Sequence, residues 1–268
     1  MKGITSEELK TGVETGRASL SEGEEFVRFS LTFRIQHMVL AVSCFLLIIT
    51  GLPLRFSDTS WAQAFFTITG GLSGSGLIHR IGAVGLIGMG IFHLFYISCL
   101  AEGRQLFKAL LPKIKDVQDV YGNVLHFFGL SERRAMFGRF SYIEKFDYWA
   151  VYWGMVIMIT TGMVLWQYEL VMAYMPKLFI DIAREVHSDE ALLATLAIVV
   201  WHMYNAHFNP DHFPMNRVWL TGKLTAKQMK HHHPLLYEEI MARRAKLDQA
   251  EDSDVHHGQL LSSSDEDS

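Results

Sequence analysis

The stretch LIHRIGAVGLIGMGIFHLFYISCLA, residues 77–101, decides the fold class of this chain. From Ile81 to Ala101 it holds 21 residues without Asp, Glu, Lys or Arg, and a helix needs about 20 mostly apolar residues to cross a bilayer. Three other charge-free stretches are 20 or 21 residues long, namely 35–54, 148–168 and 191–210. The sequence therefore predicts an all-α integral membrane protein, a bundle of four transmembrane helices.

The composition agrees with a membrane protein. Half of the 268 residues are apolar and 19% are charged, whereas soluble proteins have about 25% charged residues. The formal net charge of −4 gives no reason to expect nucleic-acid binding. Two cysteines, Cys44 and Cys99, exclude a disulfide framework and any four-cysteine metal site.

Four regions are predicted along the chain. They are a polar cytoplasmic segment at 1–30, a transmembrane domain at 31–210 with spans at about 35–54, 79–101, 147–168 and 187–208, a cytoplasmic extension at 211–246, and a disordered acidic tail at 247–268. A fifth charge-free stretch, 59–79, has TITGGLSGSG at its centre, which favours a loop or re-entrant segment. The cytoplasmic connection 102–146 is predicted to carry an amphipathic helix on the lipid surface, because apolar residues recur there near helical spacing with basic residues between them.

The distribution of basic residues predicts the orientation. Twenty Lys and Arg residues flank the spans on the side of both termini, and four lie on the other side. Since cytoplasmic loops carry the excess of Lys and Arg, both termini should face the cytoplasm of a bacterial inner membrane.

Histidines in the spans carry the predicted chemistry, because ionisable residues inside a membrane are costly and mark functional sites. His79 and His93 are 14 residues apart in the second span, and His187 and His202 are 15 apart in the fourth. On an α-helix each pair stays within about 60° of one face and about 22 Å apart along the axis. Because these two spans run parallel, His79 should lie level with His187, and His93 level with His202.

Two histidines from facing helices at one depth are typical of a bis-imidazole iron site in a helix bundle. Two such pairs predict two stacked b-type haems. Gly76, Gly82 and Gly90 lie three residues from a histidine and would leave room for a flat macrocycle. His37 and His207 lie near the cytoplasmic ends of the first and fourth spans, and α-helical geometry turns His207 about 140° away from His202. His207 would then face a third haem, a quinone pocket or the phosphate layer.

Several segments resemble the cytochrome b (gamma) subunit of membrane-bound formate dehydrogenases and hydrogenases, and most closely the stand-alone branch associated with multihaem electron-transfer complexes. The resemblance covers about residues 28–240. It rests on RIQHMVLAVSCFLLIITGLPL (34–54), LIHRIGAVG (77–85) with HLFY (93–96), FGRFSYIEKFDYWAVYWGMVIMITTG (137–162) and REVHSDEALLATLAIVVWHMYNAHFNPDHFPMNRVWLTGK (184–223).

The resemblance implies two b haems and a quinone site near the cytoplasmic face. It pairs His79 with His187, in agreement with depth. For the second haem the resemblance pairs His37 with His202. Equal depth in the membrane instead pairs His93 with His202, and both alternatives stay open. A third haem on the remaining histidines, His93 or His37 with His207, is the alternative to two. The candidate residues of the quinone site are Tyr204, Asn205, Asp211, Lys145, Tyr148 and His207.

We therefore expect a membrane electron-transfer subunit of a respiratory complex, either non-catalytic or reactive with quinone. It would carry electrons between a periplasmic iron–sulfur or multihaem cytochrome c subunit and menaquinone or ubiquinone of the membrane pool. Trp61, Phe65 and Phe66 are candidate contacts for the periplasmic partner. The alternatives are a metal-ion transporter, which would need acidic ligands that the four charge-free stretches lack, and a structural membrane anchor, which leaves the paired histidines without a role. The histidines outside the spans, among them His126 and the 231–233 run, are expected on solvated faces.

Overall fold

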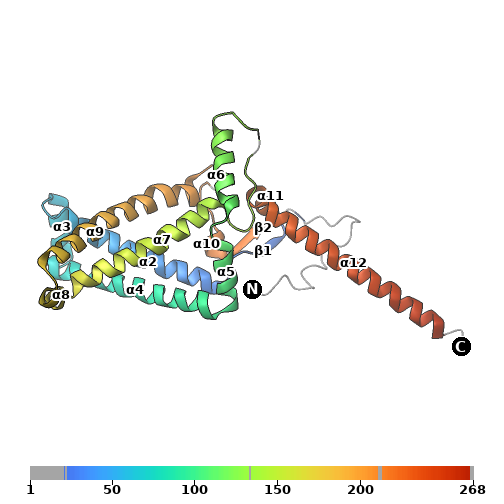
Figure 1. Cartoon of the computed structure of the whole chain (residues 1–268), viewed down its shortest axis with the longest axis horizontal. Coiled ribbons are helices and arrows are strands. Elements are labelled where there is room, and N and C mark those ends of the chain that lie inside the picture. The colour runs from blue at the N-terminus through green and yellow to red at the C-terminus, as the bar shows by residue number, and fades with distance from the viewer. Residues whose placement is uncertain (1–20, 22, 133, 211–212, 266–268) are drawn as a thin grey trace. The chain divides into compact units, whose positions relative to one another are not determined.

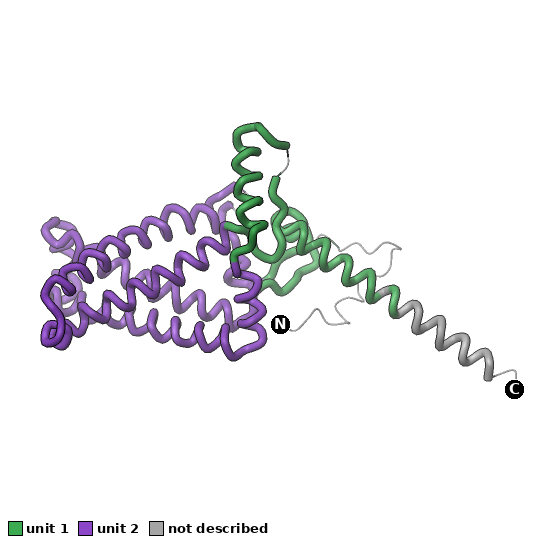
Figure 2. The backbone as a smooth tube through the Cα atoms, viewed as in Figure 1, with its two compact units in different colours: residues 1–28, 112–142, 223–268 green, residues 29–111, 143–222 purple. Residues whose placement is uncertain are grey.

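The computed structural model describes residues 21, 23–132, 134–210 and 213–265, with the side chains of residue 248 and of 251–265 left out. The chain divides into two units, coloured separately in Figure 2. The larger unit comprises 29–111 and 143–222, and the smaller comprises 1–28, 112–142 and 223–268. Each unit is treated by itself below.

Four long helices make up the larger unit and run lengthwise in Figure 1. They are α2 (Leu31–Arg55), α4 (Gly71–Cys99), α7 (Tyr142–Trp166) and α9 (Lys177–Leu196), which continues through the π-helical segments η1 (Ala197–His202) and η2 (Tyr204–Phe208). Each of the four is long and apolar enough to cross a membrane. The predicted all-α membrane fold with four spans is therefore confirmed.

The helices α2 and α4 pack closely because small residues lie between them. A Cβ atom on Gly82 would lie 3.1 Å from Leu47 Cγ, and one on Gly85 would lie 2.5 Å from Ser43 Oγ. Small residues at such positions let two backbones approach each other in a membrane, where tight packing drives helix association. The glycine-rich second span thus holds the first span at a fixed distance.

The fifth charge-free stretch is not a loop, so the loop alternative is wrong, while the re-entrant alternative stays a prediction. It contains α3 (Ser60–Ile68) and the first two turns of α4, separated by a turn at Gly70 and Gly71. Both glycines have positive φ, 82° and 84°, a conformation that costs glycine little. The turn needs only these two residues, and the later glycines continue the helix at about 1 kcal/mol each relative to Ala.

The predicted single surface helix is two helices. Helix α5 (Ala101–Leu110) ends before Pro112, and α6 (Ile114–Phe127) begins after it. Proline lacks the backbone N–H that a continuous helix would use, and it restricts the residue before it. Two further short helices belong to the larger unit: α8 (Tyr168–Tyr174) joins α7 to α9, and α10 (Val218–Thr221) follows η2.

The smaller unit contains a two-stranded sheet that the sequence did not predict. Strand β1 (Glu25–Val27) pairs antiparallel with β2 (Lys223–Thr225), so the N-terminal segment and the C-terminal extension form one substructure. Helix α11 (Ala226–His232) and helix α12 (Pro234–Asp265) follow. The Arg244 guanidinium donates to Glu24 Oε1 at 2.8 Å and connects α12 to the residue just before the first strand. Helix α12 continues to Asp265, whereas the composition of 247–268 predicts disorder; Ala, Leu, Gln and Glu in this stretch favour helix.

Candidate functional site

His79 of α4 and His187 of α9 lie face to edge inside the larger unit. Their ring centroids are 6.4 Å apart and their planes make an angle of 69°. The two residues are 108 positions apart in the chain and come from helices that sequence reasoning placed side by side. We call them the first histidine pair.

Two threonines hold the rings of the first histidine pair. Thr50 Oγ1 lies 2.8 Å from His79 Nδ1, and Thr161 Oγ1 lies 2.9 Å from His187 Nδ1. The Thr50 hydroxyl donates to Leu46 O at 2.6 Å, and the Thr161 hydroxyl donates to Ile157 O at 2.7 Å. Because each hydroxyl proton is used in this way, each threonine oxygen accepts from Nδ1–H. Both imidazoles therefore present an unprotonated Nε2.

A glycine follows each of these threonines and makes room for the ring. A Cβ atom on Gly51 would lie 3.5 Å from His79 Cε1, and one on Gly162 would lie 3.1 Å from His187 Cε1. The Thr-Gly dipeptides on α2 and α7 thus serve the two histidines in the same manner. Sequence reasoning missed them, although the dipeptide recurs in the first and third spans.

The glycines that the sequence singled out have other surroundings. Gly82 faces Leu46 and Leu47 of α2, and a Cβ on Gly90 would lie 3.6 Å from Met155 Cε. Nothing lies within 4 Å of the Cβ position at Gly76. Contacts between helices therefore explain Gly82 and Gly90. The glycines that lie against the rings of His79 and His187 are Gly51 and Gly162, on the opposing helices α2 and α7.

His37 of α2 and His202 of η1 form a second histidine pair. Their ring centroids are also 6.4 Å apart, with an interplanar angle of 42°. His202 Nδ1 lies 3.2 Å from Asp147 Oδ2, whose other oxygen accepts from Trp201 Nε1 at 2.8 Å. His37 Nδ1 is buried and has no hydrogen-bond partner within the described residues. The sequence left His37 and His93 as alternative partners of His202, and the structure places the His37 ring next to it.

His93 has different neighbours. Its Nδ1 lies 2.8 Å from Gln36 Oε1 of α2, and its Nε2 lies 3.0 Å from the Tyr148 hydroxyl of α7. Its ring also lies 6.3 Å from that of Tyr96. Both ring nitrogens therefore have protein partners, in contrast to the histidines of the first pair.

The π-helical segments change the expected direction of His207. In a π-helix the hydrogen bonds join residues i and i+5, so residues five apart lie nearer one face than in an α-helix. His202 and His207 are five apart, and His207 shares the Trp219 ring with His37, at 6.0 and 5.9 Å. The prediction that His207 is turned away from the His202 face assumed a regular α-helix and is wrong.

The candidate quinone residues do not form one cluster within the described part of the chain. Tyr204 is 54% exposed, and the Asn205 amide donates to Trp201 O of its own helix at 2.9 Å. Lys145 is buried near the start of α7. Asp211 lies outside the described residues. Tyr148, by contrast, takes part in the hydrogen-bonded group around His93.

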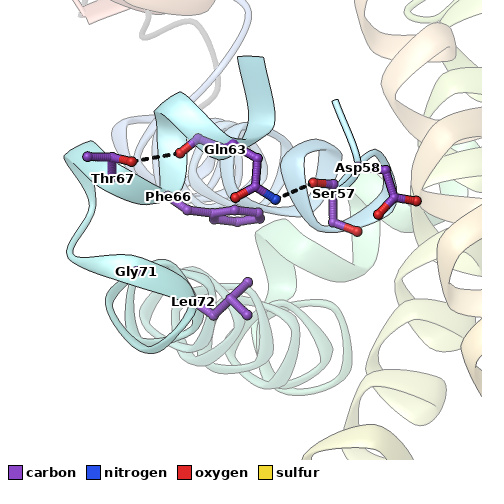
Figure 3. Close-up of a pocket in the computed structure, with 7 residues that line it drawn as sticks. All are labelled: Ser57, Asp58, Gln63, Phe66, Thr67, Gly71 and Leu72. Carbon is purple, nitrogen blue, oxygen red and sulfur yellow. Dashed lines mark hydrogen bonds between the residues drawn. The ribbon is translucent and has the colours of Figure 1, made fainter. Parts of the chain in front are cut away.

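At the other end of the unit a cavity of about 470 Å³ lies between the end of α2, α3 and the start of α4 (Figure 3). Its polar side chains bond locally: Gln63 Nε2 donates to Ser57 O at 2.6 Å, and Thr67 Oγ1 donates to Gln63 O at 2.9 Å. Phe66 lines this cavity and is buried, whereas Trp61 is half exposed. Of these two candidate contacts for a partner, only Trp61 presents its ring at the surface.

Both histidine pairs fit a b-type haem. A metal–imidazole bond is about 2.0 Å and the ring centroid lies about 1.1 Å behind Nε2, so two imidazoles that hold one metal between them would have centroids about 6.2 Å apart. The observed separation is 6.4 Å in both pairs. The donor set agrees at His79, His187 and His202, because an imidazole whose Nδ1 is hydrogen-bonded is a usual haem ligand. His37 Nδ1 has no such partner within the described residues. In the described residues, no group of three His, Cys, Asp or Glu could hold a separate metal ion.

Comparisons with known proteins point to the same class. The profile of a family described as prokaryotic cytochrome b561 matches residues 28–239. The cytochrome b556 subunit of a formate dehydrogenase from Haemophilus influenzae is 23% identical over 228 residues, 85% of this chain and 89% of that protein. The cytochrome b556(Fdn) subunit of the nitrate-inducible formate dehydrogenase of Escherichia coli K12 is 22% identical over 233 residues, 87% of this chain and 99% of that protein.

Proposed function

Because the chain belongs to the prokaryotic cytochrome b561 family and is a multi-pass membrane cytochrome b for electron transfer, we propose that it conducts electrons through two b haems. The first histidine pair holds one haem and the second histidine pair holds the other. The observation that carries the proposal is the 6.4 Å separation of the rings in both pairs. A bound haem supplies an iron that accepts and gives up one electron at a time.

The chain's own residues set how each iron site behaves. Thr50 and Thr161 keep Nδ1 protonated and Nε2 available in the first pair. Asp147 accepts from His202 Nδ1–H in the second pair, and a carboxylate partner makes an imidazole a stronger electron donor than a hydroxyl does. The second site should therefore stabilise the oxidised iron more strongly. With histidine on both sides of the metal, oxygen binding is disfavoured.

Two haems are the base proposal because four histidines form the two pairs, while His93 is hydrogen-bonded at both nitrogens. His207, near Trp219, is left for the surroundings of the second site. A third haem on the remaining histidines is the alternative. It would require His93 Nε2 to give up the Tyr148 hydroxyl, while Nδ1 could keep Gln36.

The excess of basic residues on the side of both termini supports an orientation in a bacterial inner membrane with the second histidine pair toward the cytoplasm. We place the quinone site at this end, and the periplasmic partner at the end of the first pair. The named relatives are subunits of formate dehydrogenases, which favours an iron–sulfur subunit over a multihaem cytochrome c subunit as that partner. The quinone is menaquinone or ubiquinone.

The test is anaerobic reduction of the purified, haem-loaded protein by menadiol, followed at the α band of the haem spectrum. We expect reduction in the wild type and loss of menadiol-driven reduction in His202→Ala, while His187→Ala keeps it at the remaining haem. A spectrum without a b-type α band would refute the proposal and favour a transporter or a structural anchor.

A further inference from the structure

A polar group of three side chains from three helices lies inside the larger unit and has no part in haem ligation as proposed above. His93 of α4 stands between Gln36 of α2 and Tyr148 of α7, at 2.8 and 3.0 Å. Gln36 is 5% exposed. Buried polar side chains in a membrane span are costly and mark a function more often than a packing contact does. We define Gln36, His93 and Tyr148 as the His93 triad.

The hydrogen bonds of the His93 triad have a direction. The Gln36 amide nitrogen faces Thr32 O at 3.4 Å, so its oxygen faces the imidazole and accepts from His93 Nδ1–H. A neutral imidazole has one donor and one acceptor nitrogen. Nε2 is therefore the acceptor, and it receives the Tyr148 O–H. The chain of donors runs from Tyr148 through His93 to Gln36.

Because of this direction, His93 Nε2 can accept the proton of the Tyr148 hydroxyl. If the Tyr148 proton moves to Nε2, the imidazolium still donates to Gln36 Oε1 and is stabilised there. The Tyr148 oxygen has lone pairs that can accept a hydrogen bond from a ligand hydroxyl, and the side chain is partly exposed. A ligand with an O–H group can thus pass its proton through Tyr148 to His93.

The His93 triad also lies next to the second histidine pair. Gln36 directly precedes His37, and Tyr148 directly follows Asp147, which accepts from His202. A molecule whose hydroxyl binds at Tyr148 would therefore lie close to the second histidine pair, where a haem would accept its electrons. A general base acts on a proton within hydrogen-bond reach or through one water, and here the Tyr148 hydroxyl takes the place of that water.

We propose that His93 is the proton acceptor of the quinol site, with Tyr148 as the group that contacts quinol and Gln36 as the residue that orients the imidazole. This inference rests on the proposed exchange between quinol and the second haem. Oxidation of a quinol breaks two O–H bonds and releases two electrons and two protons. The haem that His37 and His202 would hold would take the electrons one at a time. One proton moves to the Tyr148 oxygen as the Tyr148 proton moves to His93 Nε2. The second proton leaves to water. Quinone reduction is the reverse.

The experiment uses the full-length, haem-loaded protein and the variants His93→Asn and Tyr148→Phe. The matched control is Tyr152→Phe, because Tyr152 lies one turn further along α7 and packs its ring against Trp149 and Trp153. Four quantities are measured: haem per chain, the two midpoint potentials, the rate of reduction by menadiol in H2O and D2O, and menadione binding by quenching of tryptophan fluorescence.

We expect both variants to keep two haems per chain and both midpoint potentials. Reduction by menadiol should slow about 100-fold, the lower end of what a general base contributes, and the wild type should be reduced more slowly in D2O than in H2O because proton transfer is part of the reaction. Menadione binding should weaken in Tyr148→Phe, and Tyr152→Phe should resemble the wild type.

Loss of a haem in His93→Asn would make His93 an axial ligand and overturn the inference. Unchanged menadiol reduction in Tyr148→Phe would overturn it as well, even if His93→Asn failed to fold. A wild-type protein that dithionite reduces but menadiol does not would refute the proposed quinol exchange, and the role of His93 with it. A reactive wild type with unaffected variants would refute the role of His93 alone.

Discussion

Replacing Asp147 by Asn should raise the midpoint potential of the haem held by the second histidine pair. Asp147 Oδ2 lies 3.2 Å from His202 Nδ1, and Nδ1 lies about 4 Å from a metal at Nε2, which puts the carboxylate about 7 Å from the iron. At an effective dielectric constant of about 20, one charge at this distance contributes about 2.4 kcal/mol to the stability of the oxidised iron. For a one-electron couple this corresponds to about 100 mV.

The assay is a potentiometric titration followed at the haem α band. Each measurement is repeated in a His79→Ala background, which leaves the second haem alone and makes the assignment unambiguous. The first haem in the Asp147→Asn single variant is the internal control and should keep its potential. Asp147→Glu should restore most of the wild-type value. A shift toward lower potential, a shift confined to the first haem, or no shift at either haem would refute the assignment of Asp147 and His202 to one site.

Three other changes test the surroundings of the sites and the fold. Thr50→Val removes the acceptor of His79 Nδ1–H and should keep the first haem but raise its midpoint potential by about 40 mV, the equivalent of one neutral hydrogen bond of about 1 kcal/mol; an unchanged titration would contradict this. Gly162→Leu should abolish the first haem, as measured by haem content, because even a Cβ would lie 3.1 Å from the His187 ring. Gly222→Ala should lower the free energy of unfolding by about 1–3 kcal/mol, because φ is 74° and the new Cβ would lie 2.5 Å from Phe29 O; an equally stable variant in thermal unfolding would disprove the strain.

The four spans could be predicted because a bilayer imposes a length and an absence of charge that a sequence shows directly. The details that sequence reasoning missed depend on single residues. Gly70 and Gly71 make a turn short enough for α4 to begin eight residues before the predicted start of the span. Pro112 divides the surface helix in two. The strand pair β1–β2 joins segments almost 200 residues apart, each only three residues long, and neither has a pattern of its own.

The pairing of His79 with His187 followed from regular helical rise, since most of the chain between each histidine and its helix end is α-helical. The same reasoning failed for the second pair because η1 and η2 interrupt the α-helical geometry around His202. The depth of a residue in the membrane also does not predict its hydrogen bonds. The sequence therefore did not show that His93, unlike His37, is hydrogen-bonded to Gln36 and Tyr148. The resemblance pairing of His37 with His202 carried that information.

The number of haems per chain and the histidines that hold them form the central claim. Pyridine haemochrome quantitation of the purified wild type, of His37→Ala, of His79→Ala and of His93→Ala tests it directly. We predict two haems in the wild type, one in His37→Ala, one in His79→Ala, and two in His93→Ala. Three haems in the wild type, or the loss of a haem in His93→Ala with retention in His37→Ala, would contradict the account.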